Sequence, residues 1–566
     1  MTLQQRPWLR HYPPGVPATL TYPEESLVQP LIRAATAHPD RPAMLFFGKR
    51  TTYRELLDQV QRAAGALAEM GVRKGDRVAI MLPNSPQCVI AYYAALWLGA
   101  VVVMVNPLYT PRELKTQLSD SGARHIIVLD IMYPKVAEVR RDTALERVVV
   151  TGLAEYLPFP LSLVFPLQLR RQGQLVRVPS APHVTRWSEL LRQAPLSEPV
   201  PVNAREDLAA LQYTGGTTGT PKGAMLTHFN LYANCVQIGA WLSEFKEDHF
   251  RVLAALPFFH VYGLTTVLNY TVFGGGTMIL IPRFDINQVL GVIRRHRPHI
   301  FPGAPTMYVA VVNHPRAREI DMSSIQACVS GAAPLPVEVQ TAFEELTGGR
   351  LVEGYGLTEA SPVTHANPVW GHRKVGSIGL PWPDTDCRIV NPETGEDVPV
   401  GEPGELLVRG PQVMKGYWNK PEETAQTLRD GWLWTGDIAR MDEDGYFYII
   451  DRKKDLIIAG GFNIYPREVE EVIYTHPAVK EATVVGVPDP YRGETVKAYI
   501  VLKEGAHVTA DEIIAHCRHH LAAYKVPKLV EFRDELPKSL VGKVLRRVLL
   551  EEELKKQADQ QRQHAG

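Results

Sequence analysis

The sequence predicts an α/β protein in which a large N-terminal domain of helix-covered, mostly parallel sheets and a β-rich subdomain precede a small α+β domain. Two observations support this fold class. Short apolar runs alternate with helical patterns up to about residue 376, as in parallel sheets covered by helices. Beyond that point short strands separated by turn sequences such as NPETGE (residues 391–396) favour an antiparallel unit.

The first part contains eight apolar runs that we expect to be strands. They are residues 78–82, 101–105, 125–129, 208–213, 252–256, 278–281, 327–330 and 351–354. One longer run, residues 89–105, carries no charge and has about the minimum length for crossing a bilayer. Because Pro86 precedes this run and Gly99 interrupts it, we interpret it as a buried helix followed by a buried strand.

The sequence pattern places a domain boundary near residue 450. We expect an N-terminal domain over 1–450, with the β-rich subdomain at about 376–450, and a C-terminal domain over 451–566. In the latter, Pro466 and the early acids Glu468, Glu470 and Glu471 are helix-start signals. Strands at 483–487 and 496–502 and a second helix at 511–522 complete the prediction.

Composition excludes several classes of protein. The 566 residues are 45% hydrophobic and 22% charged, which is the balance of a globular chain and not of a disordered one. Lys and Arg number 61 and Asp and Glu number 61, so no net field favours nucleic acid. The five cysteines form no C-x-x-C pair and the N-terminus has no secretory pattern, so we expect a cytoplasmic location.

The most informative stretch is YTGGTTGTPKG, residues 213–223. Its backbone N–H groups, hydroxyls and one ammonium suit a polyanion. It is not a Walker loop, because Gly219 is followed by Thr220 and Pro221 where that pattern needs Lys and Ser or Thr. The residues alone leave two interpretations open, a polyphosphate-binding loop and a solvated glycine-rich turn.

This loop resembles the phosphate-binding loop of the acyl-adenylate-forming enzymes. Five further stretches resemble that family in the same order: SGAAPL (330–335), YGLTEASP (355–362), GWLWTGD (431–437), the hinge region 448–470 and PKSLVGKVLRR (537–547). The motif spelling and the insertion at 157–173 are most similar to bacterial long-chain fatty-acid CoA ligases. The resemblance implies that ATP and Mg²⁺ convert a fatty acid to acyl-AMP and that coenzyme A then takes the acyl group.

The resemblance also assigns site residues. The phosphates would be bound by Thr214, Gly215, Gly216, Thr217, Thr218, Gly219 and Lys222, and the adenine would lie beside Gly331, Ala332, Ala333, Tyr355 and Gly356. Asp437 and Arg452 would contact the ribose. Thr358 and Glu359 would hold Mg²⁺ and, with Lys543, make up the catalytic set.

The chemistry fits these residue types. A carboxylic acid is already ionised at neutral pH, so the first step needs charge compensation and no general base. Lys543 would supply it, although the residue alone could equally be a solvated lysine opening a helix at 544–552. For the second step the resemblance implies a mobile C-terminal domain that rotates about a hinge at Asp451, with Gly460 and Gly461 beside the pantetheine.

Substrate choice is expected to depend on PFFHVYG, residues 257–263. Relatives that activate amino acids carry an Asp where His260 stands, so an amino acid is disfavoured. His260 and Gly263 are therefore expected in the acyl pocket. Medium-chain and aryl acids stay open within the enzyme class, and a non-catalytic adenylate-binding protein is the alternative of another class. A homodimer also stays open, and no nucleic-acid partner is expected.

One segment is explained by none of these motifs. Residues 156–169 carry no charge, contain Pro158, Pro160 and Pro166, and are followed by Arg170 and Arg171. The segment is too short to span a membrane and its prolines predict that it is not helical. Three interpretations of residues 156–171 stay open: peripheral contact with the inner face of the cell membrane, a position beside the mouth of an acyl tunnel, or packing against their own domain.

Overall fold

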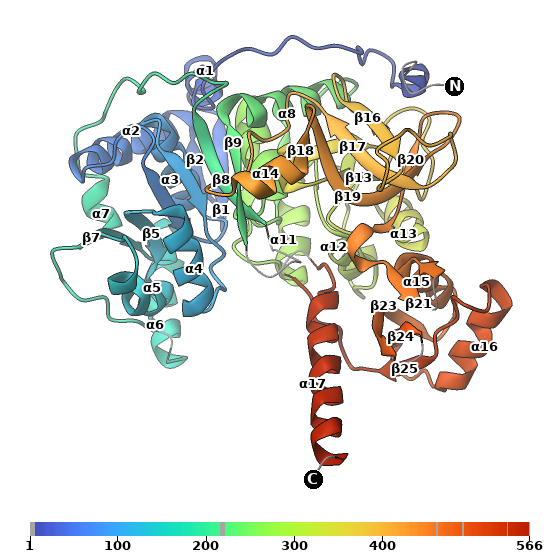
Figure 1. Cartoon of the computed structure of the whole chain (residues 1–566). Helices are drawn as coiled ribbons and strands as arrows, with labels where there is room; N and C mark the ends of the chain where they lie inside the picture. The colour runs from blue at the N-terminus through green and yellow to red at the C-terminus, as the bar shows by residue number, and fades with distance from the viewer. Residues whose placement is uncertain are drawn as a thin grey trace. The chain divides into compact units, whose positions relative to one another are not determined.

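The computed structural model describes residues 6–173, 175–214, 221–459, 462–489, 492–539 and 542–564. Contacts within the chain divide it into two compact units. The large unit comprises Trp8–Asp386 and Val408–Leu433, and the small unit comprises Cys387–Leu407 and the chain from Trp434 onward. Figure 1 follows the chain through both.

A seven-stranded sheet organises the first half of the large unit. Its order is β7 (Val184–Arg186), β6 (Arg147–Thr151), β5 (His125–Leu129), β3 (Arg77–Met81), β4 (Val101–Met104), β8 (Leu208–Thr214) and β9 (Lys222–Thr227). Every neighbouring pair is parallel except the β8–β9 pair. The expected strands at 78–82, 101–105, 125–129 and 208–213 are confirmed.

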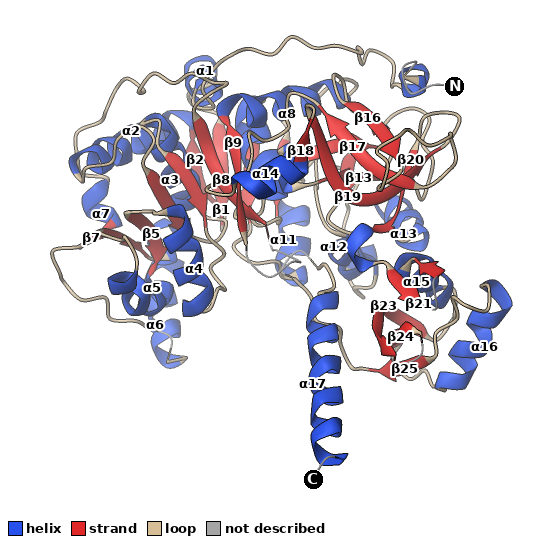
Figure 2. Ribbon diagram, viewed as in Figure 1, coloured by secondary structure: helices blue, strands red, loops and turns tan. Residues whose placement is uncertain are grey.

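Helices cover this sheet, as the blue ribbons in Figure 2 show. They are α2 (Tyr53–Glu69), α3 (Pro86–Trp97), α4 (Pro111–Ser121), α5 (Tyr133–Val139), α7 (Trp187–Leu190) and α8 (His228–Trp241), with α1 (Gln29–Ala37) packed on α2. All residues of α3 are buried, and the Ser85 hydroxyl caps it by accepting from the Cys88 N–H. The uncharged run 89–105 is thus a buried helix followed by β4, as predicted. Among the described helices none is long and apolar enough to cross a membrane.

Two four-stranded sheets complete the large unit. One has the order β10 (Arg251–Ala254), β11 (Thr277–Leu280), β1 (Pro42–Phe46) and β2 (Lys49–Thr52); the other has the order β12 (Ala327–Ser330), β13 (Arg350–Gly356), β14 (Val363–Ala366) and β15 (Leu380–Pro381). Ile300 forms single bridges to Val252 of β10 and Ala327 of β12 and so joins the two sheets, and Gly303 forms another to Ser330 of β12. The remaining four expected strands are therefore confirmed.

Further helices flank these sheets. They are α9 (Val261–Gly263), the π-helix η6 (Leu264–Asn269), α10 (Tyr270–Phe273), α11 (Ile286–His296), α12 (Pro305–Val312) and α13 (Val337–Thr347). Short 3₁₀ turns are η2 (Pro7–His11), η3 (Asp130–Met132), η4 (Arg140–Asp142), η5 (Leu153–Tyr156), η7 (Ala317–Glu319), η8 (Thr358–Ala360) and η9 (Lys453–Asp455). η5 leads into α6, and η8 carries two of the expected site residues.

The β-rich stretch forms one sheet from β16 (Asp386–Val390), β17 (Gly404–Arg409), β18 (Leu428–Arg429), β19 (Trp432–Met441) and β20 (Phe447–Arg452), with α14 (Pro421–Thr427) before β18. The β18–β19 and β19–β20 pairs are antiparallel. In the turn at 391–396 the Asn391 N–H donates to the Glu396 carbonyl, and Gly395 has a φ of 74° that favours glycine.

The C-terminal α+β fold has the expected elements. They are β21 (Ile457–Ala459), β22 (Phe462–Ile464), α15 (Pro466–Tyr474), β23 (Val479–Asp489), β24 (Gly493–Leu502), α16 (Ala510–His520), β25 (Leu529–Phe532) and α17 (Arg546–His564). One sheet, ordered β22-β21-β24-β23 with β25 on β24, buries Val484, Ala498 and Ile500 against α15 and α16. Together with the parallel sheets of the large unit, this confirms the predicted fold class.

One prediction about local structure is wrong. The segment expected to be non-helical contains α6 (Leu161–Arg171), with Pro166 inside the helix. Proline removes only its own N–H bond, to the fourth residue before it, and strains the turn there. The surrounding residues include four leucines, which favour helix and support the turns on either side. The helix propensity of the leucines therefore outweighs the effect of the prolines in this segment.

Candidate functional site

The ends of the expected phosphate loop lie on neighbouring strands. β8 and β9 are antiparallel, and Thr214 lies opposite Lys222, so the loop connects two paired strands. Gly215, Gly216, Thr217, Thr218 and Gly219, which we predict to bind phosphate, lie outside the described residues. The Lys222 ammonium nitrogen is 5.1 Å from the centroid of the Tyr417 ring, which is within the range of a cation–π contact.

Tyr417 connects this lysine to Glu359, one of the two residues predicted to hold Mg²⁺. Its hydroxyl donates to Oε1 of Glu359 over 2.6 Å. Burial, and then the Glu359 carboxylate, raise the pKa of Tyr417 well above its usual value, so the phenol stays a neutral donor. Lys222, Tyr417 and Glu359 therefore form one chain of contacts within the large unit.

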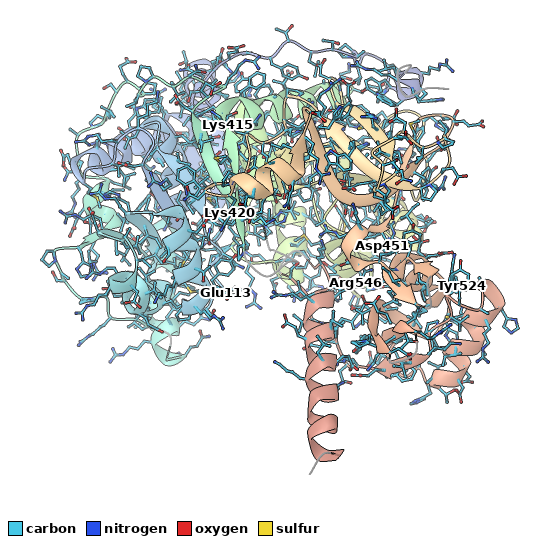
Figure 3. The ribbon with its side chains drawn as sticks, viewed as in Figure 1. Glu113, Lys415, Lys420, Asp451, Tyr524 and Arg546 are labelled. Carbon is cyan, nitrogen blue, oxygen red and sulfur yellow. The ribbon has the colours of Figure 1, made fainter. Side chains whose placement is uncertain are left out.

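Backbone pairing fixes the position of Tyr417. The segment 415–418 runs beside β9: the Met225 N–H donates to Gly416 O and the Trp418 N–H donates to Gly223 O, both over 2.8 Å. Lys415, the first residue of this segment, and Lys420, just after it, are labelled in Figure 3. Sequence reasoning missed Tyr417, because its partners Glu359 and Lys222 lie far away in sequence. Its position in PQVMKGYW, between two matched motifs, is the only signal that the sequence offers.

Thr358 and Glu359 stand on η8, directly after β13. The Met414 N–H donates to the Glu359 carbonyl over 2.8 Å and so holds the turn. A Cβ at Gly356 would overlap the carbonyl oxygen of Pro362, so the close return of the chain at this point requires glycine. Thr358 and Glu359 are both half-buried, next to the exposed Gly356.

Tyr355, expected beside the adenine, lies on β13 opposite His365 of β14. The two rings meet edge to face with centroids 5.8 Å apart. His365 is fully buried, and burial lowers its pKa to about 3, so this imidazole is neutral. The tyrosine ring is half-buried and supported from one side by a neutral aromatic ring.

Two expected motifs meet at Gly331. A Cβ on this residue would be 3.0 Å from the Tyr262 ring, whose hydroxyl donates to Val329 O over 2.7 Å. Ala332, exposed, follows with a φ of 70°, and Ala333 is half-buried. The structure therefore brings the segment expected beside the adenine, Gly331 to Ala333, against the segment expected in the acyl pocket.

His260 precedes α9, and its Nδ1 accepts from the Tyr262 N–H over 3.2 Å. Gly263 is buried, and a Cβ there would overlap the carbonyl oxygen of Pro257. The backbone of the same loop therefore occupies the space beside Gly263, and the packing explains why a glycine is present.

Two buried amides hold this loop, and sequence reasoning missed both. Asn84 donates to Ala254 O over 3.0 Å and to Leu256 O over 2.8 Å, and accepts from the Phe258 N–H over 2.9 Å. Gln212, two residues before Thr214, donates to Phe259 O over 2.5 Å. The His260 loop is thereby tied to the strand that leads into the phosphate loop.

In the small unit Asp437 and Arg452 face each other across β19 and β20. Nε of Arg452 is 3.4 Å from Oδ1 of Asp437. The aspartate is buried and the arginine is half-buried. The two residues predicted to contact the ribose are thus neighbours in space.

Asp451, the expected hinge, is buried and held on several sides. Oδ1 of Asp451 accepts from the Arg452 N–H, and Oδ2 accepts from the Arg467 N–H, both over 2.7 Å. The Arg546 guanidinium is 3.3 Å from Oδ1. Burial raises the pKa of Asp451, and Arg546 opposes that rise. Figure 3 labels Asp451 on β20 and Arg546 at the start of α17. The same guanidinium also pairs with Asp455 at 3.0 Å and Glu470 at 2.8 Å.

Lys543 closes a short turn. Its N–H donates to the Ser539 hydroxyl over 3.1 Å, and its carbonyl accepts from the Ser539 N–H over 2.7 Å. Gly542 before it has a φ of 78°. The helix expected at 544 begins at Arg546, so Lys543 lies on the turn ahead of α17 and not inside it. Gly460 and Gly461, expected beside the pantetheine, lie outside the described residues.

Comparison with known proteins identifies the family. A model of the "AMP-binding enzyme" family matches residues 31–418, and a model of the "AMP-binding enzyme C-terminal domain" matches residues 468–543. The chain belongs to the AMP-binding enzyme family. This AMP-binding enzyme is similar to a long-chain-fatty-acid–CoA ligase of Bacillus subtilis, at 52% identity over 97% of the chain and 98% of the relative.

Two further proteins are similar to the chain over most of its length. A feruloyl-CoA synthase of Amycolatopsis is 42% identical over 91% of the chain and 96% of its own length. The crystal structure of ATP-bound MatB from Rhodopseudomonas palustris is 31% identical and has a TM-score of 0.82, covering 93% of this chain and 99% of that one. The predicted fold class and family resemblance are both confirmed.

Proposed function

We propose that this AMP-binding enzyme is a ligase that activates a long-chain fatty acid with ATP and transfers the acyl group to coenzyme A. The observation that carries the proposal is the 52% identity, over almost the full length of both chains, to a ligase of that name. A non-catalytic adenylate-binding protein is disfavoured, because Lys222, Glu359 and Lys543 are all present.

In the proposed first step a carboxylate oxygen of the fatty acid attacks the α-phosphorus of ATP. The new O–P bond gives the acyl-adenylate, and pyrophosphate leaves. The acid is already ionised, so the enzyme positions the two anions and compensates their charge. Lys222, Thr214 and the loop between them would bind the departing phosphates, and the Lys543 ammonium would stabilise the oxygens around the α-phosphorus.

We further propose that Glu359 and Thr358 hold Mg²⁺. Among the described residues no group of three or more His, Cys, Asp and Glu side chains could hold a metal ion. Magnesium is commonly bound through one or two carboxylates plus substrate phosphates and waters, and Glu359 offers one such carboxylate. Bound there, the ion would neutralise phosphate charge. The Tyr417 hydrogen bond would orient the Glu359 carboxylate for that contact.

For the second step we propose that the chain after residue 450 changes orientation at Asp451. The thiol of coenzyme A would then attack the acyl carbon, a C–S bond would form and AMP would leave. Gly460 and Gly461 would let the pantetheine pass close to the backbone. Asp437 and Arg452, on the preceding strands, would hold the ribose.

The second candidate is a CoA ligase for aryl or medium-chain acids. The 42% identity to a feruloyl-CoA synthase favours the aryl form of this alternative. His260 and Tyr262, whose loop is held by Asn84, would then contact an aromatic ring instead of an alkyl chain.

The deciding experiment is pyrophosphate release across a panel of acids. If the pocket is apolar, each buried CH₂ contributes about 0.8 kcal/mol, so kcat/KM should rise roughly fourfold per CH₂ between acetate and palmitate. A kcat/KM for ferulate or acetate equal to that for palmitate would overturn the long-chain assignment. Formation of no adenylate from any acid would favour the binding protein.

We also propose a cytoplasmic location. All five cysteines are buried free thiols, which suits a reducing compartment.

A further inference from the structure

Helix α6 presents apolar side chains to solvent. Phe159, just before it, is 81% exposed, Leu163 is 64% exposed and Leu167 is 59% exposed; Leu161 and Val164 are exposed as well. No residue of α6 is buried. Contiguous exposed apolar groups of this kind are uncommon on a soluble protein and mark an interaction surface.

One face of helix α6 is half-buried and the opposite face is exposed to solvent. Ser162, Phe165, Pro166 and Leu169 are half-buried and follow the i, i+3, i+4, i+7 spacing of one helix face. Leu163, Val164 and Leu167 lie on the opposite face. In Figure 1 the helix lies at the outer margin of the large unit, at the end of the cyan part of the ribbon. The sequence interpretation that the whole segment packs on its own domain therefore holds for one face only.

The exposed face continues into positive charge. Arg170 and Arg171 lie one turn beyond Leu167, and both are exposed. Between Tyr156 and Ser188 the sequence contains four arginines, which are Arg170, Arg171, Arg177 and Arg186, and it contains no Asp or Glu. The formal net charge of the whole chain is zero, so this stretch is locally positive. An apolar stripe beside such a cluster is complementary to a surface with an apolar interior and anionic head groups.

We propose that α6 binds the surface of a bilayer containing anionic lipids, with Leu163, Val164 and Leu167 inserted and Arg170 and Arg171 at the phosphates. Eleven residues of helix are roughly 16 Å long, about half the hydrocarbon thickness, so the helix lies in the surface and does not cross. A second copy of this chain fits less well, because a two-fold contact between α6 helices would bring four arginines together.

Vesicle flotation of the full chain tests this proposal. The wild type should float with vesicles of phosphatidylcholine and phosphatidylglycerol and much less with phosphatidylcholine alone, and added salt should weaken its binding. Leu163→Ser with Leu167→Ser should lower the partition coefficient at least tenfold. Arg170→Gln with Arg171→Gln should lower it roughly 25-fold on anionic vesicles, at about fivefold per arginine.

A matched control is Leu108→Ser with Val375→Ser, since both side chains are exposed apolar residues of the large unit that are not part of α6. This variant should float like the wild type. The α6 variants should still form adenylate from a water-soluble acid, which shows that they are folded. If adenylate formation fails for every acid while flotation behaves as expected, the proposed function falls and the lipid contact stands.

Three results would overturn the lipid contact. One is wild-type protein that binds neither kind of vesicle. Another is a Leu163/Leu167 variant that binds as tightly as the wild type. The third is a wild type that is dimeric by light scattering and becomes monomeric in that variant, because a second chain would then cover the apolar face.

Discussion

Lys543 and Lys538 lie five residues apart on one turn and have different surroundings. The Lys538 ammonium is engaged by the Glu481 carboxylate at 2.6 Å, which suits a structural role. The backbone of Lys543 is fixed on both sides by Ser539, while its side chain is half-buried. The Lys538 side chain is thus engaged by Glu481, and the backbone of Lys543 is fixed in the turn by Ser539.

We predict that Lys543→Ala lowers acyl-adenylate formation by about a hundredfold or more, the scale of removing one preorganised charge from a transition state. Thioester formation from supplied acyl-adenylate should survive. Measuring the two half-reactions separately gives the answer. Lys538→Ala is the matched control and should reduce adenylation far less. An equal loss of both half-reactions in Lys543→Ala would show that the lysine serves folding or docking.

The sequence predicted residues whose partners are close in sequence or whose motif is distinctive. Asp437 and Arg452 are of this kind, and the structure places them as neighbours. Tyr417 and Asn84 are not. The contact of Tyr417 with Glu359 depends on pairing between residues 415–418 and β9, and the three hydrogen bonds of Asn84 join residues about 170 positions apart. No local sequence pattern indicates contacts between residues so far apart in the chain.

At the scale of elements, β20, α15 and α17 are joined by one cation. Arg546, the first residue of α17, contacts Asp451 on β20 and Glu470 on α15. Removing a cation partly from water is costly unless carboxylates pair with it. Arg546 is half-buried and three carboxylates pair with it, Asp455 being the third. The turn that carries Lys543 is therefore connected, through the start of α17, to the proposed hinge.

We predict that Asp451→Pro retains adenylate formation and loses thioester formation, because proline restricts φ at the proposed hinge. Proline also removes the carboxylate, so Asp451→Asn is the matched control: it keeps an oxygen acceptor for the Arg467 N–H and leaves φ free. The asparagine variant should keep both half-reactions within a few fold. Unchanged turnover in the proline variant would place the hinge elsewhere, and loss in both variants would assign the effect to the side chain.

Elements were predictable where their apolar pattern was continuous. The eight strands that the sequence predicted in the large unit follow short, mainly apolar runs, and α3 is buried on every side, as its lack of charge implied. The three prolines predicted that the segment containing α6 is not helical, although only Pro166 lies inside the helix. Its exposed apolar face could not be read from the sequence, because an apolar helix is ordinarily buried.

At the scale of the whole molecule, buried histidines couple the stability of the large unit to pH. His228, at the start of α8, and His365, on β14, are both fully buried. Burial lowers the pKa of His228 to about 4 and that of His365 to about 3. The unfolded chain binds protons at these residues below pH 6.5, whereas the folded unit does not. Their contribution is therefore fully present above pH 6.5 and is lost as the pH falls from 6.5 toward 4.

We predict that the free energy of unfolding of the large unit falls by about 1.4 kcal/mol per pH unit for each of these two histidines near pH 5. Urea unfolding followed by tryptophan fluorescence measures it, since all nine tryptophans except Trp434 belong to this unit. His228→Asn and His365→Asn should each flatten the dependence between pH 6.5 and 5. Phe343→Leu, in the buried core, is the control and should shift stability equally at every pH, because it removes no titrating group. A wild type whose stability is constant over this window would refute the assignment of neutral, buried imidazoles.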